Sequence, residues 1–307
     1  MTDKPYYSVN EYLKQTYGEK VYRLSLDAGF TCPNRDGCIS SSGCAFCSAG
    51  GSGDFAGSRL LSITEQLAQG KEKLRQKCKC HKFIAYFQAF TNTYAPVAKL
   101  HALYTEAMAD SEVVALSVAT RPDCISDEVL SLIAELSEEK PIWIELGLQT
   151  IHDETRQQMN SGFSYDCFQN TLMRLHERNI PVIVHLILGL PGETQTDMLA
   201  SVKAVSALPV WGIKLQLLHV LKGTALGLQY EAHPFPVFTL EEYTEILIDC
   251  IEQLPTDMVI HRITGDGPRA LLLAPTWSTN KKHVLNYIHR RFRERNTWQG
   301  KLFHPNT

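Results

Sequence analysis

The residues most able to bind a metal or take part in a reaction are four cysteines that lie close together in the chain, Cys32, Cys38, Cys44 and Cys47. Two residues separate Cys44 from Cys47, so both thiolates can bind one metal centre, and a third cysteine of the same loop completes a three-point attachment. A fourth ligand at Cys38 would make a closed, zinc-type site, whereas three protein ligands leave one position open for chemistry. The spacing by itself leaves zinc and an iron–sulfur cluster both open.

Three ionisable side chains stand in otherwise apolar, β-rich segments, and they are Glu145, His185 and Lys214. Carboxyl, imidazole and amino groups can all transfer protons, so each is a candidate acid or base. The alternatives are a structural carboxylate at Glu145 that pairs with Arg121, and a hydrogen-bonded core histidine at position 185. Because side chains alternate along a strand, Glu145 and Gln149 are expected on the same face.

The elements that must position these residues alternate between β-rich runs and helical periodicity from residue 20 to residue 220. Six β/α repeats imply parallel strands, because each strand needs a crossover helix to return in the same direction. Near-continuous apolar runs such as VIVHLILGL suit strands that are buried on both faces. We therefore predict an α/β fold, a partial (β/α)6 TIM-type barrel with a C-terminal extension. The predicted strands are 21–26, 83–87, 113–119, 142–148, 182–188 and 213–220.

In such a barrel, functional groups gather at the carboxyl ends of the strands. The cysteine loop follows the first strand, and this place at the barrel mouth favours chemistry over a structural zinc site. We accordingly divide the chain into a barrel at 1–220, with its cysteine loop at 30–55, and an extension at 221–307 that completes the core.

The extension contains a predicted helix at 240–254, a short strand at 258–262 and a basic helix at 281–295. The basic helix, KKHVLNYIHRRFRER, holds six Lys or Arg and two His against one Glu, and aromatic residues interleave with them. That composition is typical of surfaces that neutralise phosphates and stack on unpaired bases, although a solvated helix face is the alternative. The candidate RNA-contacting residues are Lys281, Lys282, Arg290, Arg291, Arg293 and Trp298.

The composition limits the class of protein. The chain has 307 residues, with 30 basic and 33 acidic side chains and a net charge of −3, so a polyanionic partner would need a local basic patch. Its hydrophobic content of 44% and mean hydropathy of −0.16 are those of a globular protein. No run approaches the roughly 18 to 20 apolar residues that span a bilayer, and the first residues lack the apolar core of a signal peptide. We expect a cytoplasmic protein that does not enter the membrane.

In combination, these motifs resemble the radical S-adenosylmethionine (SAM) superfamily, and most closely its YhcC-like branch, which is related to the catalytic subunit of Elongator. The resemblance starts in the cysteine loop, with CPNRDG at 32–37, GCAFC at 43–47 and GGSGDF at 50–55. It continues at residues 119–123, 145–150, 188–194, 261–266 and 274–277.

The resemblance implies a [4Fe-4S] cluster held by Cys32, Cys44 and Cys47, with Cys38 as a neighbour that is not a ligand. It also implies bound SAM and an electron donor such as flavodoxin or ferredoxin; it leaves the oligomeric state open. The SAM contacts that it implies are Phe46, Gln88, Asn92, Thr93, Arg121, Gln149 and Leu190.

The activity implied by the resemblance is modification of the tRNA wobble uridine. Its most specific form is conversion of carboxymethylaminomethyl-(2-thio)uridine to aminomethyl-(2-thio)uridine, in which Glu145, His185 and Lys214 handle protons and His219 lies near the substrate. Two alternatives remain open. One is a radical SAM enzyme for a small metabolite or a protein side chain, and the other is a zinc-loop RNA-binding protein without catalysis.

Overall fold

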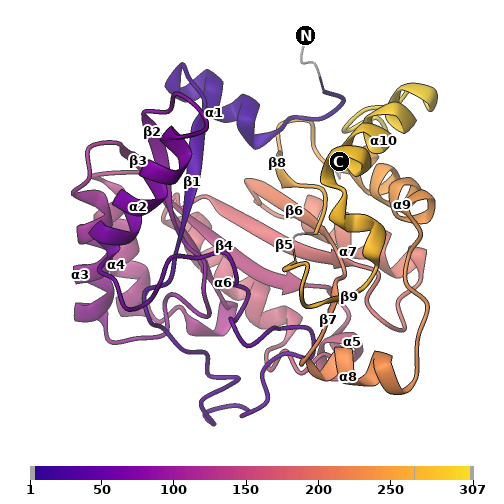
Figure 1. Cartoon of the computed structure of the whole chain (residues 1–307), viewed down its shortest axis with the longest axis horizontal. Helices are drawn as coiled ribbons and strands as arrows, with labels where there is room; N and C mark the ends of the chain where they lie inside the picture. Colours follow the sequence, from indigo (N-terminus) through magenta and orange to yellow (C-terminus); the bar gives the residue numbers. More distant parts are fainter. Residues whose placement is uncertain (1–3, 266, 305–307) are drawn as a thin grey trace.

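A single curled sheet of seven parallel strands forms the centre of the computed structural model, which describes residues 4–265 and 267–304 (Figure 1). The strand order is β1-β2-β3-β4-β5-β6-β8, so the strands of this sheet lie in the order in which they occur along the chain. The predicted α/β partial barrel is therefore confirmed. The strands are β1 Val21–Leu26, β2 Lys82–Phe87, β3 Val113–Thr120, β4 Ile142–Gln149, β5 Val182–Leu188, β6 Gly212–Leu217 and β8 Val259–Arg262.

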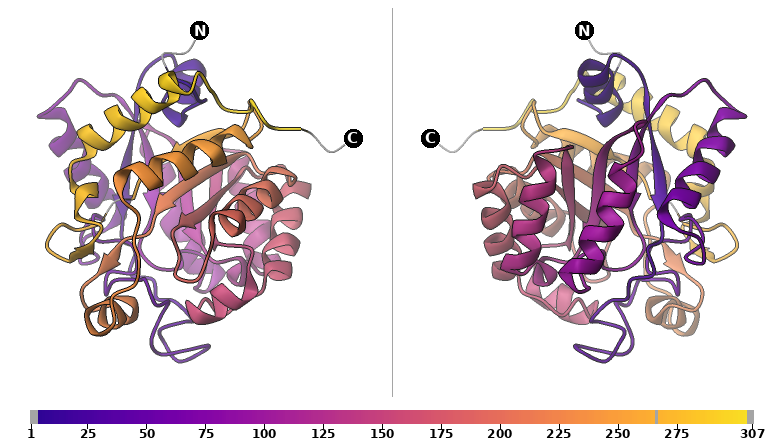
Figure 2. Two further views of the ribbon diagram at one scale, coloured as in Figure 1. Left: turned by 90° about the vertical axis from the view of Figure 1, so that its right-hand side faces the viewer. Right: turned by 90° about the vertical axis from the view of Figure 1, so that its left-hand side faces the viewer.

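The helices that connect these strands cover the convex face of the sheet (Figure 2). The chain chemistry sets where several of them begin, because Ser62, Thr194 and Thr239 each form a capping box with the acidic residue three positions later. The connecting helices are α2 Ile63–Arg75, α3 Val97–Met108, α4 Asp127–Ser137, α6 Tyr165–Glu177, α7 Gln195–Ser206 and α9 Leu240–Glu252. Shorter segments are η1 Pro122–Cys124, α5 Asp153–Gln158, α8 Ala225–Ala232 and η2 Thr276–Thr279.

The prediction of six repeats was one strand short. The predicted strand at 258–262 is β8, and it pairs parallel with β6 as the seventh strand of the same sheet. The sixth predicted strand was also too long, since β6 ends at Leu217 and the next residues form β7 Val220–Leu221, which pairs antiparallel with β9 Leu272–Ala274. Both differences arise from pairing between segments that are distant in sequence. Asp266, in the motif at 261–266, lies outside the described residues.

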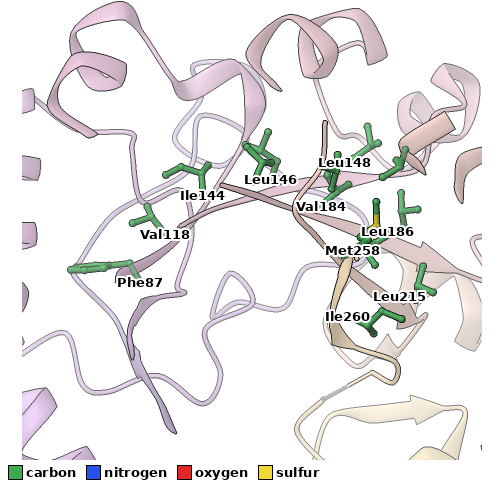
Figure 3. Packing of buried hydrophobic residues seen from close by; sticks show 14 of the residues in the cluster. Phe87, Val118, Ile144, Leu146, Leu148, Val184, Leu186, Leu215, Met258 and Ile260 are labelled. Carbon is green, nitrogen blue, oxygen red and sulfur yellow. The ribbon is translucent and has the colours of Figure 1, made fainter. Parts of the chain in front are cut away.

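The main core lies between the sheet and its outer helices (Figure 3). Ile144, Leu146 and Leu148 of β4 belong to this core, whereas Glu145 and Gly147 line the inside of the barrel. A separate apolar cluster fills the amino end of the barrel, where α1 Val9–Tyr17 packs its Leu13 in the same cluster as Trp143. The helix α1 thus closes one end of the barrel, and the cysteine loop lies at the opposite end (Figure 1).

Candidate active site

A cavity of about 370 Å³ opens at the carboxyl ends of the strands. Cys32, Cys44 and Cys47 line it from the cysteine loop, and Glu145, His185 and Lys214 line it from inside the barrel. The structure therefore brings the predicted cluster ligands and the predicted proton-transfer residues to one site. This is the arrangement expected of a barrel whose chemistry takes place at its mouth.

The interior of the barrel is layered. The apolar layer next to α1 includes Val21, Ile84, Ala115, Trp143 and Ile183. Two residues further along each of these strands, the next inward side chain is polar, which follows from the period-two alternation of a strand. With Lys214 from β6, this polar layer consists of Arg23, Tyr86, Ser117, Glu145, His185 and Lys214. It forms the floor of the cavity.

Glu145 is the centre of the polar layer and is fully buried. Its Oε1 accepts a hydrogen bond of 2.7 Å from the Ser117 hydroxyl and lies 3.5 Å from the Arg23 guanidinium. Its Oε2 accepts from His185 Nε2 at 2.8 Å and from the Lys214 ammonium. Burial alone would raise the pKa of Glu145, but the charges of Lys214 and Arg23 and the His185 hydrogen bond hold it well below its usual value. Glu145 is therefore ionised.

The alternative pairing of Glu145 with Arg121 is wrong. Arg121 instead makes a bidentate contact with Asp123, with distances of 2.9 and 2.8 Å. The two partners of this ion pair are two residues apart after the end of β3, so the contact is local and leaves Glu145 to the side chains that point into the barrel.

Burial lowers the pKa of both Lys214 and His185, but the two groups end at different values. Burial lowers the pKa of Lys214 to about 7, with repulsion from Arg23 and Arg262 adding to the effect and Glu145 opposing it. Burial and the charge of Lys214 lower the pKa of His185 to about 4. Near neutral pH, His185 is therefore uncharged and Lys214 is the group that titrates.

The cysteine loop is held by its own polar side chains. Arg35 donates to the carbonyl oxygens of Cys47 and Ser48 at 3.1 and 2.6 Å, and the Asn34 amide lies 3.4 Å from the Cys44 sulfur. Cys38 is exposed and does not line the cavity. A hydrogen bond from Cys44 lowers the pKa of Cys47 to about 7 against the effect of burial, with Ser52 and the charge of Arg35 contributing.

The donor set fits an iron–sulfur cluster with a polar ligand beside it. Cys32, Cys44 and Cys47 offer three thiolates at the cavity, and thiolates are the ligands that hold iron–sulfur clusters in proteins. Two buried polar atoms that line the cavity, Gln149 Oε1 and Ser161 Oγ, have no hydrogen-bond partner in the described protein. Gln149 also has a φ of 73°, a conformation that is uncommon for non-glycine residues and that clusters at functional sites.

The predicted SAM contacts divide into two groups. Phe46, Gln88, Arg121 and Gln149 line the cavity, as does the predicted substrate contact His219. The others do not line it, because their side chains are used elsewhere. Asn92 donates to the Ala119 carbonyl, Thr93 bonds to Thr120 and the Cys124 carbonyl, and Leu190 packs in an apolar cluster beside Ala45.

The predicted basic helix is α10 Lys281–Glu294, which packs beside α9 (Figure 1). Of its predicted RNA-contacting residues, Lys281, Lys282, Arg290 and Arg293 are exposed, and Trp298 lies beyond its end with half of its surface exposed. Arg291 instead turns toward α9 and forms ion pairs with Glu245 and Glu294. Neighbouring Arg295 pairs with acidic residues of α9 as well.

Comparison with known families shows which superfamily the chain belongs to. The radical SAM superfamily domain matches residues 32–205, and the radical SAM C-terminal domain matches residues 210–294. The chain belongs to the radical SAM superfamily. It is therefore an enzyme whose cofactors are a [4Fe-4S] cluster and SAM, and the alternative of a zinc-loop protein without catalysis is overturned.

Similar proteins also support the predicted branch of this radical SAM enzyme. It is 44% identical to the uncharacterized YtqA of Bacillus subtilis, covering 98% of this chain and 94% of that protein. It is 41% identical to YhcC of Escherichia coli, covering 88% and 86%. The tRNA uridine(34) acetyltransferase of Methanocaldococcus infernus is 24% identical over 52% of this chain and 30% of its own length.

Among solved structures, Elp3 of Methanocaldococcus infernus has the same fold as this radical SAM enzyme. The TM-score is 0.70 at 16% identity, and the match covers 91% of this chain and 64% of that chain. Within residues 4–265 and 267–304, none of the helices has the length and apolar character needed to cross a membrane.

Sequence reasoning missed Arg23, Tyr86, Ser117 and His261 as site residues. Arg23 Nη2 lies 2.6 Å from His261 Nδ1, and the Tyr86 hydroxyl lies 3.3 Å from Lys214 Nζ. The signal that could have found three of them is the spacing: Arg23, Tyr86 and Ser117 each stand two residues beyond an inward apolar position. His261 gave no such signal, because β8 was not assigned to the barrel.

Proposed function

We propose that this radical SAM enzyme modifies the wobble uridine of tRNA, and most specifically that it converts carboxymethylaminomethyl-(2-thio)uridine to aminomethyl-(2-thio)uridine. The observation that carries the proposal is the exposed basic and aromatic surface of α10 on a chain whose barrel holds the radical cavity. Two relatives are named tRNA uridine(34) acetyltransferases, and these names support the choice of base.

The proposed RNA surface is a stripe along α10, which we define as Lys282, Asn286, Arg290 and Arg293. These residues follow one another at helical spacing and are all exposed. The Arg290 guanidinium lies 4.9 Å from the centre of the Tyr287 ring, and its contact with Glu294 is long, at 3.5 Å. Such a stripe can neutralise phosphates and offer a ring for stacking. We place Lys281 and Trp298 at its two ends, whereas Arg291 is held by α9.

Within the cavity, we propose that Cys32, Cys44 and Cys47 hold the cluster and that Phe46, Gln88, Arg121 and Gln149 contact SAM. A cluster held by these cysteines and reduced by a flavodoxin or ferredoxin would, with bound SAM, supply an adenosyl radical to begin the reaction. The protein keeps this radical from water, because the polar layer and the apolar layer beneath it close the floor of the barrel.

We propose that proton transfer by the chain's own side chains takes place in the polar layer at the floor of the cavity. His185 is uncharged near neutral pH and can accept a proton, while Glu145 stays ionised and orients both His185 and Lys214. His219 lines the cavity from the segment after β6, which supports a proposed contact with the base. In the proposed reaction, SAM would serve as the two-electron oxidant: a hydrogen leaves the carbon between the amino nitrogen and the carboxylate, and the resulting imine is hydrolysed by water. The carboxymethyl carbons then leave as glyoxylate, and the nitrogen stays with the uridine as the aminomethyl group.

The test is an anaerobic assay of the reconstituted, reduced enzyme with SAM, with and without tRNA that carries carboxymethylaminomethyl-uridine. We expect 5′-deoxyadenosine and, by mass spectrometry of the nucleosides, a matching amount of aminomethyl-uridine. Deoxyadenosine without any change in the nucleosides would contradict the tRNA assignment and favour a small metabolite or a protein side chain as the substrate.

A further inference from the structure

The polar layer contains more positive than negative charge. Arg23 and Lys214 face a single carboxylate, Glu145, and both oxygens of Glu145 are already engaged by four donors. The other acidic side chain among the described cavity residues, Asp54, accepts two contacts from Ser48 in the cysteine loop. Two cations therefore share one carboxylate in a buried setting, where excess charge is costly, so this layer is complementary to an anion from outside the protein.

We propose that Lys214 and its surroundings form a carboxylate-binding site at the floor of the cavity, with the Lys214 ammonium as the direct partner of the substrate's carboxylate. The inference rests on the proposed function and deepens it, because it names the group of the substrate that the floor recognises. Lys214 Nζ donates to Glu145 and to the Tyr86 hydroxyl, which leaves the third N–H of the ammonium for a ligand.

The neighbours of Lys214 fit this role. Arg262 is its register partner on β8 and lines the same cavity, so its positive charge adds to the potential that an anion meets there. His185, with 14% of its side chain exposed, donates to the same Glu145 oxygen as Lys214 and lines the same cavity, so it lies next to the proposed site. Tyr86 is buried beneath the Lys214 ammonium, which lies 4.9 Å from its ring centre. The site therefore offers donors and positive charge at the closed end of the cavity.

Lys214 also makes the site sensitive to pH. Its pKa of about 7 reflects burial and repulsion by Arg23 and Arg262, opposed by Glu145, while His185 and His261 are uncharged near neutral pH. A bound carboxylate would stabilise the ammonium form and raise this pKa. Binding should therefore take up a proton near pH 7, and carboxylate affinity should fall as the pH rises above 7.

The experiment compares two anticodon stem-loop RNAs that differ in one group, the wobble carboxymethylaminomethyl-uridine and its carboxamide. Dissociation constants are measured by fluorescence anisotropy on the reconstituted enzyme with SAM and without reductant, so that no turnover occurs. We expect the carboxylate RNA to bind roughly 10 to 100 times more tightly, as for one charge-assisted hydrogen bond. Lys214→Gln should abolish the preference, and Lys214→Arg should retain most of it. Equal binding of the two RNAs by the wild type would overturn the site.

A second probe separates this inference from the proposed function. N-methylglycine carries the same amino and carboxylate groups without any RNA, and calorimetry in two buffers of different ionisation enthalpy measures the protons taken up when it binds. We expect proton uptake in the wild type and none in Lys214→Gln. If no tRNA nucleoside is converted but this uptake is seen, the carboxylate site stands and the tRNA assignment fails. If the nucleoside is converted but the enzyme shows neither a preference for the carboxylate RNA nor proton uptake, the tRNA assignment stands and the carboxylate site fails.

Discussion

Replacement of Glu145 by glutamine tests whether the polar layer is the charged floor that the contacts describe. Glu145 is fully buried and faces the Lys214 ammonium and the Arg23 guanidinium. Removing one partner of a buried pair leaves an uncompensated charge, which typically costs about 3 to 5 kcal/mol. We therefore expect Glu145→Gln to lower the free energy of unfolding by about that amount at pH 6.

The pH dependence of this loss follows from Lys214. Its folded pKa is about 7 in the wild type, with Glu145 holding it up against burial, so the variant's pKa must be lower. Below pH 7, the wild-type native state binds a proton that the variant's native state has lost. Each pH unit over which this holds adds about 1.4 kcal/mol to the difference in stability. The destabilisation should therefore be about 1.4 kcal/mol greater at pH 6 than at pH 8.5.

The assay is urea denaturation of both proteins under anaerobic conditions at the two pH values. The matched control is Glu245→Gln, which removes the same charge from partly exposed ion pairs with Arg291 and Arg295, and which should cost less than about 1 kcal/mol. The reasoning is refuted if the free energy of unfolding of Glu145→Gln is within 1 kcal/mol of the wild-type value at pH 6, or if its loss of stability is greater at pH 8.5. Either result would mean that Glu145 does not compensate the buried charge of Lys214.

Two further predictions concern the mouth of the cavity and α10. Cys44→Ala should abolish the iron content, the cluster absorbance and SAM cleavage, and the protein should stay folded because the loop lies outside the main core. The control Cys38→Ala, at an exposed cysteine, should retain all three properties. SAM cleavage by the Cys44 variant would refute the ligand assignment. The double variant Arg290→Glu, Arg293→Glu should weaken tRNA binding and reduce its salt dependence, as measured by anisotropy at several salt concentrations. The control Arg291→Gln, which breaks an ion pair to Glu245 of α9 and one to Glu294 of α10, should leave the salt dependence nearly unchanged. Equal effects of the two changes would place the RNA surface elsewhere.

Much of the site was readable along the chain because its signals are local. The cysteine loop is a short continuous segment, and its spacing indicates a metal centre before any fold is known. The parallel strands could be assigned from short apolar runs, and their order in the sheet follows the chain. Period-two alternation also predicted that Glu145 and Gln149 share one face of their strand, and both line the cavity.

Only the tertiary structure decided which side chains meet. By sequence reasoning alone, Glu145 could have paired with Arg121. Its partners instead come from β1, β3, β5 and β6, which the sheet brings together. The most distant of them in sequence, Arg23, is 122 residues away from Glu145. In the same way, Arg291 is indistinguishable from Arg290 in the sequence, but α9 engages the first and leaves the second exposed. Residue types and local periodicity act over a few neighbouring positions, whereas charge pairing inside a barrel depends on strand register, which no single segment contains.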